Sequence, residues 1–104
     1  MPAYMLFIRE SAVVDPAALA AYSTANRSHA RTFVERYGLK PLAVYGAAEA
    51  FEGEAPDGVV LLEFPDAAAA RAWYASPEYQ AALPDRHKGA PYRALLLEGL
   101  DRTL

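Results

Sequence analysis

The sequence contains no cysteine. Disulfide bonds, thiolate nucleophiles and cysteine-based zinc sites are therefore excluded. No apolar run approaches the ~20 residues that span a bilayer. The first nine residues also lack the basic start and the small-residue cleavage site of a signal peptide. We therefore expect a cytoplasmic protein that does not associate with membranes.

Positive charge is also scarce. Ten basic and thirteen acidic residues give a net charge of −3, and the arginines are spread from Arg9 to Arg102 without clustering. Such a chain has no basic surface to attract a nucleic acid backbone, so no nucleic acid partner is expected. Its two histidines, His29 and His87, have no carboxylate at metal-ligand spacing, so no metal site is predicted.

Motifs that hold phosphates or activate a serine are missing as well. The chain has neither a glycine-rich phosphate loop nor a Gly-x-Ser-x-Gly sequence. We predict no cofactor. Hydrophobic residues make up 54% of the 104 residues and charged residues 22%, which excludes disorder and favours a chain that folds around one core. This length predicts a single domain over residues 1–104.

Proline, glycine and capping residues mark where helices and strands begin and end along the chain. The pattern predicts strands over residues 3–9, 40–47, 59–64 and 92–98, one helix of about 22 residues from Asp15-Pro16 to Tyr37, a helix over 67–75, and a short helix from Ser76-Pro77 to Pro84. Residues 48–56 either continue the second strand and then turn or form a solvated acidic loop, and residues 85–89 should form a polar connection. Asp15, Asp66 and Ser76 precede the helices as N-caps.

The order strand, helix, strand, strand, helix, strand predicts an α+β, ferredoxin-like βαββαβ fold. In this fold a four-stranded antiparallel sheet carries its helices on one face. The predicted strands are apolar on both faces: Tyr4, Leu6 and Ile8 point opposite to Met5 and Phe7. Helices on one face leave the other uncovered, and an apolar patch of that size is abnormal for a monomer. We therefore predict a homodimer with its sheets face to face.

Several short motifs carry a family resemblance. They are Glu52-Gly53-Glu54, Glu63-Phe64-Pro65, Ala72-Trp73-Tyr74, Ser76-Pro77-Glu78-Tyr79-Gln80, Arg86 and Leu97-Glu98-Gly99. With these motifs the segment from Gly38 to Gly99 resembles the bacterial domain-of-unknown-function 1330 proteins of the dimeric α+β barrel superfamily. The resemblance implies a dimeric barrel and no established activity.

Fold analogy within that superfamily implies a ligand cleft between sheet and helices. Its relatives include antibiotic-biosynthesis monooxygenases, isomerases and haem enzymes. Family members often carry Arg-Gly-Gly where this chain has Val44-Tyr45-Gly46, so a frequent cation of the cleft is replaced here.

Two polar residues on the first helix are candidates for such a cleft. Asn26 lies near the centre of the apolar stripe and His29 near its edge. They either find internal hydrogen-bond partners and fix the register of the helix, or they line the cleft. In the second case His29 would act as an acid–base group and Asn26 would orient a ligand.

The remaining candidates are one arginine and three tyrosines. Arg86 either pairs with Glu63 or Glu78 or binds a ligand carboxylate. Tyr4, Tyr22 and Tyr45 are candidates for the rim of an aromatic pocket. His87 is expected on the solvated surface.

Two functional hypotheses remain. The protein is a homodimer that binds a small, partly apolar metabolite in the cleft, with cofactor-free isomerase or oxygenase chemistry as a catalytic variant. Alternatively, it is a structural dimerisation module. The sequence favours binding and leaves open whether the protein is an enzyme.

Overall fold

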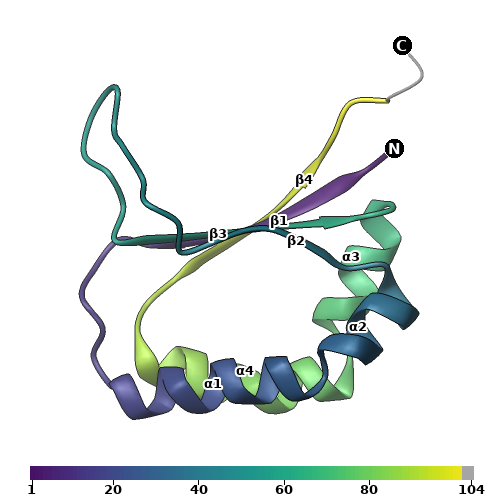
Figure 1. The fold of residues 1–104 in the computed structure, drawn as a ribbon, viewed down its shortest axis with the longest axis horizontal. Helices are drawn as coiled ribbons and strands as arrows, with labels where there is room; N and C mark the ends of the chain where they lie inside the picture. Colours follow the sequence, from purple (N-terminus) through teal and green to yellow (C-terminus); the bar gives the residue numbers. More distant parts are fainter. Residues whose placement is uncertain (102–104) are drawn as a thin grey trace.

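The computed structural model describes residues 1–101, in which four strands and four helices follow one another (Figure 1). The elements are β1 (Ala3–Arg9), α1 (Pro16–Ser28), α2 (Ala30–Tyr37), β2 (Lys40–Val44), β3 (Gly58–Phe64), α3 (Ala67–Tyr74), α4 (Pro77–Gly89) and β4 (Arg93–Glu98). No helix within these residues is long and apolar enough to cross a membrane.

The strands form one antiparallel sheet in the order β2-β3-β1-β4. All four helices lie on the same side of it, with α1 and α4 side by side (Figure 1). The predicted ferredoxin-like fold is therefore confirmed. We call the helix-covered side of the sheet the inner face and the opposite side the outer face.

The predicted N-caps hold the starts of three helices. Asp15 accepts a hydrogen bond from the Ala18 N–H at 3.1 Å, and Asp66 accepts one from Ala69 at 2.8 Å. The Ser76 hydroxyl accepts from the Tyr79 N–H at 3.2 Å. Each cap satisfies a backbone donor that the first helical turn leaves unpaired.

The single long helix expected up to Tyr37 is instead two helices, α1 and α2, that meet at His29. There the backbone (φ −105°, ψ 6°) leaves the helical region. The Ser28 hydroxyl donates to the Ala25 carbonyl at 2.7 Å and competes with the helical hydrogen bond. The break turns α2 toward the sheet, where Phe33 is buried edge-on against Trp73 at 6.0 Å.

The last helix also differs from the prediction, because α4 continues through Pro84 to Gly89. A proline inside a helix costs about 3 kcal/mol. Here the buried residues of α4 repeat at helical spacing and pack on α1, which offsets that cost; they are Tyr79, Ala82, Leu83, Arg86 and Gly89. Residues 85–89 are therefore helical, and His87 is exposed on the helix surface.

Glycine at position 89 permits this close packing. A Cβ there would lie 2.5 Å from the side chain of Leu19 on α1. The Gly89 carbonyl also accepts hydrogen bonds from the N–H groups of Val14 and Asp15, at 2.7 and 3.0 Å. The end of α4 is thereby joined to the start of α1.

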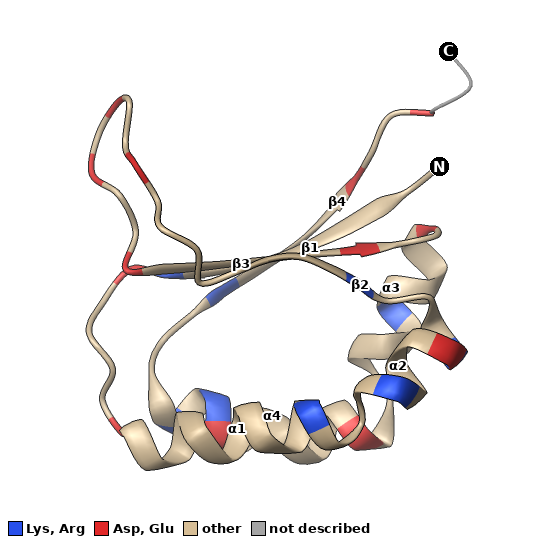
Figure 2. Cartoon of the chain, in the orientation of Figure 1, with Lys and Arg blue, Asp and Glu red and all other residues tan. Residues whose placement is uncertain are grey.

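β2 is shorter than the predicted strand, which extended to Ala47. Tyr45 adopts a left-handed backbone conformation (φ 55°), so the strand ends at Val44. The chain then forms a loop over residues 46–57, which rises on the side of the sheet opposite to the helices (Figure 1). Its charged residues are all acidic (Figure 2): Glu49, Glu52, Glu54 and Asp57.

A candidate ligand pocket between the sheet and the helices

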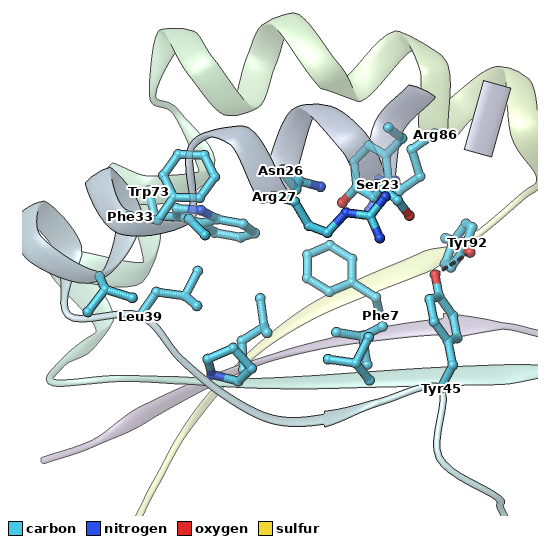
Figure 3. A pocket seen from close by; sticks show the side chains of 17 residues that line it. Phe7, Ser23, Asn26, Arg27, Phe33, Leu39, Tyr45, Trp73, Arg86 and Tyr92 are labelled. Carbon is cyan, nitrogen blue, oxygen red and sulfur yellow. Dashed lines mark hydrogen bonds between the residues drawn. The ribbon is translucent and has the colours of Figure 1, made fainter. Parts of the chain in front are cut away.

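A pocket of about 320 Å³ lies between the inner face and the helices (Figure 3). This volume is at the small end of the range for ligand sites. Its seventeen lining residues come from β1, β2, β3, all four helices and the segments beside β2 and β4: Phe7, Tyr22, Ser23, Asn26, Arg27, Ala30, Phe33, Val34, Leu39, Pro41, Val44, Tyr45, Val60, Leu62, Trp73, Arg86 and Tyr92. The wall is mostly apolar and includes six aromatic side chains.

Arg86 brings a buried positive charge to this apolar wall. Arg86 is only 4% exposed. Its guanidinium lies over the rings of Phe7 and Tyr92, at 5.1 and 5.4 Å from the ring centres. These ring faces attract a cation but cannot accept all of its hydrogen bonds. Accordingly, Nε and Nη1 of Arg86 are buried without a hydrogen-bond partner among residues 1–101.

Two pairs of tyrosines join elements around the pocket. The hydroxyls of Tyr45 and Tyr92 lie 2.6 Å apart, as Figure 3 shows, and those of Tyr22 and Tyr79 lie 2.8 Å apart. Burial, the largest cause, raises the pKa of Tyr22, Tyr45 and Tyr79 above the ordinary value of 10. These hydroxyls therefore stay protonated at neutral pH and act as neutral hydrogen-bonding groups.

Two further polar atoms at the pocket residues have no partner. The side-chain oxygen of Asn26 and the indole N–H of Trp73 are both buried and, within the described chain, make no hydrogen bond. Such an atom costs about 1–3 kcal/mol when it is removed from water without compensation. The residues that line the pocket therefore carry, within the described chain, an unpaired buried acceptor, an unpaired buried neutral donor and unpaired buried cationic donors.

Four of the six residues predicted to bind a ligand line this pocket: Tyr22, Asn26, Tyr45 and Arg86. The other two do not. Tyr4 lies on the outer face, where its hydroxyl donates to Glu63 at 3.4 Å. His29 lies at the junction of α1 and α2, where its ring contacts Phe33 at 5.9 Å. Among the hydrogen bonds of residues 1–101, none gives the His29 side chain an acid–base partner. A ligand role for the six residues stays a prediction.

Neither carboxylate considered as a partner of Arg86 pairs with it. Glu78 instead forms an ion pair with Arg36 at 3.3 Å. Glu63 projects from the outer face, away from the pocket. Among residues 1–101, no group of three or more His, Asp or Glu side chains is placed to hold a metal ion.

Sequence reasoning missed several lining residues. Trp73, which was named only within a family motif, belongs to both the core and the pocket wall. Arg27 was not among the candidates, and Tyr92 was predicted only as the start of a strand. Apolar periodicity finds such residues but cannot show where packing stops short of filling the space.

The comparisons with known proteins place this chain in a family. Residues 2–100 match the model of a domain of unknown function, DUF1330. The chain belongs to the DUF1330 family. No curated protein matches it at a significant level.

Solved structures show the same fold. A dimeric ferredoxin-like protein of unknown function from Jannaschia sp. CCS1 superimposes with a TM-score of 0.70 at 21% identity, over 95% of this chain and all (100%) of the other. A protein of unknown function from Rhodopseudomonas palustris gives 0.68 at 24%, over 96% and 83% of the two chains. A dimeric ferredoxin-like protein from Thermobifida fusca YX gives 0.61 at 20%, over 94% and 90%. At these identities the likeness extends to the fold alone.

Proposed function

We propose that this protein is a homodimer that binds a small, partly apolar metabolite in the pocket of each subunit. One observation carries the proposal: the apolar pocket contains buried polar atoms, on Asn26, Trp73 and Arg86, that the described chain leaves unpaired. Native proteins pair nearly all buried polar groups. A molecule bound in the pocket would supply partners for unpaired groups on the residues around it.

The outer face supports the dimer. Leu6 lies between Leu61 and Leu95 in the sheet register, which gives an apolar row across three strands. Leu95 and Leu97 are 46% and 58% exposed. An apolar sheet face without cover is unfavourable in water, and a second copy of the same face would cover it.

The total exposed area agrees with a missing partner. A monomer of 11.3 kDa is expected to expose about 5,700 Å², whereas this chain exposes 6,624 Å². The excess resembles the ~800 Å² that one subunit contributes to a stable interface. The loop 46–57 rises on the outer side, with Phe51 90% exposed, so a second copy on the outer face would meet it.

Binding is tested by a thermal-shift screen of small aromatic and carboxylate metabolites with the full chain. We expect a hit that raises Tm and that Asn26→Ala weakens, because Asn26 lines the pocket. Thr24→Ala, an exposed change on the same helix, is the control and should keep the hit. A screen without hits would instead favour a structural dimerisation module. A cytoplasmic location stays a prediction.

A further inference from the structure

The charge balance of the pocket is uneven. Its lining includes two arginines, Arg27 and Arg86, but no Asp or Glu. Arg27 is exposed at the rim, whereas Arg86 is almost completely buried. A charge removed from water is unfavourable unless it is paired, so the pocket needs a negative charge near Arg86.

No side chain of the described residues supplies that charge. The carboxylates of α4 and of the N-cap of α1 do not pair with Arg86. Glu78 pairs with Arg36, Asp15 pairs with Lys88 at 3.7 Å, and Asp85, the sequence neighbour of Arg86, forms no ion pair with it. The hydroxyls of Tyr22 and Tyr79 are protonated at neutral pH, because burial raises the pKa of both. Neither tyrosine can therefore act as the counter-ion of Arg86.

The position of Arg86 is fixed rather than adaptable. It stands on the buried side of α4, in the turns after Pro84, and its guanidinium rests on Phe7 and Tyr92. Contacts on both rings orient the planar guanidinium, whose Nε and Nη1 are buried and make no hydrogen bond within the described chain. The Nη1 and Nη2 groups of a guanidinium donate side by side in one plane, which matches the two oxygens of a carboxylate.

We propose that the pocket binds a small carboxylic acid with a flat apolar body, whose carboxylate pairs with Arg86. The inference rests on the proposed function and names the class of its ligand. Aromatic side chains such as Phe33 and Trp73 would pack on the body of the acid (Figure 3). A hydroxyl on that body would donate to the unpaired oxygen of Asn26.

A matched pair of probes isolates the carboxylate. 4-Hydroxybenzoate and 4-hydroxybenzamide have nearly the same shape, but only the first carries a negative charge at neutral pH. The chain contains a single tryptophan, Trp73, which lines the pocket, so its fluorescence reports occupancy directly. We expect the acid to bind about 10- to 100-fold more tightly than the amide, as a charged hydrogen-bonded pair predicts.

Arg86→Met keeps an apolar side chain of similar length and removes the charge. We expect it to abolish the preference for the acid and to raise the Tm of the ligand-free protein by a few degrees, since an unpaired buried charge is removed. A purely structural arginine would give a lower Tm. The control is Lys88→Met, which removes one exposed positive charge from the same helix and should leave the preference unchanged.

The outcomes separate the two proposals. If the amide binds as tightly as the acid, or if Arg86→Met keeps the preference, the carboxylate proposal is overturned while pocket binding stands. If neither probe binds at millimolar concentration, and the wider screen also gives no hit, both proposals are overturned. The acid–amide comparison uses the unmodified protein, so it does not depend on any variant folding.

Discussion

The two faces of the sheet are built from the same strands and are both apolar, yet they differ in what covers them. On the inner face Met5, Phe7 and Leu62 are 3–8% exposed beneath the helices. On the outer face Leu95 and Leu97 remain about half exposed. The helices of this chain cover the inner face, whereas the outer face has no such cover within residues 1–101 (Figure 1).

The inner face should contribute to the folding of one subunit, and the outer face to the association of two. Inner-face residues pack on α2, α3 and α4 around Trp73, so their contribution to stability belongs to one subunit. Outer-face residues would contribute only when a second copy is present. The same substitution, made one residue apart on one strand, should therefore have effects that depend differently on protein concentration.

The largest effect is expected on the inner face. Leu62→Ala removes a side chain that is 8% exposed and should lower the free energy of unfolding by about 2–5 kcal/mol through the cavity that it leaves. Urea denaturation followed by circular dichroism measures the loss. Leu61→Ala, the neighbour on the outer face, is the matched comparison, and its smaller cost should grow with protein concentration. Equal, concentration-independent costs would contradict the distinction between the faces.

Dimerisation should be the next most sensitive property. Leu95→Glu places a charge at the end of the apolar row beside Leu6, and burying it against a partner would leave it unpaired. We expect at least a tenfold weaker dimer in sedimentation equilibrium, with little loss of helix signal. Val14→Glu, at a position 74% exposed outside the sheet, is the control and should keep the dimer. A wild-type protein that sediments as a monomer would refute the assembly itself.

Alkaline pH should lower the stability of the protein through three tyrosines that lie between the sheet and the helices. The pKa of Tyr22, Tyr45 and Tyr79 is raised, chiefly by burial, so the folded chain retains protons that the unfolded chain releases above pH 10. This stability is fully present below pH 10 and is lost as pH rises above it. Tm measured between pH 9 and 11.5 should fall, and less steeply for Tyr79→Phe. A flat profile for both proteins would contradict the assignment.

The smallest effect on folding is expected in the loop 46–57. Phe51→Ser changes a side chain that is 90% exposed, so the free energy of unfolding of the subunit should change by no more than about 0.5 kcal/mol. If a partner covers the outer face and meets this loop, the same variant should weaken the dimer measurably. An unchanged dimer dissociation constant would remove the loop from the interface.

Local signals predicted the elements well and the helix boundaries less well. Asp15, Asp66 and Ser76 mark their helices because a cap is a contact within four residues. Pro84 misled the prediction for the opposite reason. Its local cost is about 3 kcal/mol, but the packing of α4 on α1, which no short sequence window contains, outweighs it.

In the candidate site, too, local sequence signals predicted some features, and long-range packing determined the others. Tyr22, Asn26 and Tyr45 were predicted from residue type and periodicity, and Arg86 partly from the family resemblance; the structure gathers all four around one cavity. Tyr4 and His29 were predicted on the same grounds but lie elsewhere. Residue type indicates what a side chain can do, whereas the register of β1 and the break at His29 determine where it points.

The sequence by itself determined the order of the strands and helices, the caps and the apolar character of both sheet faces, because these depend on neighbours in the chain and on a period of two or 3.6 residues. Only the tertiary structure decided that α4 carries Arg86 into a pocket without a counter-charge, since that outcome depends on how helices far apart in the sequence pack together.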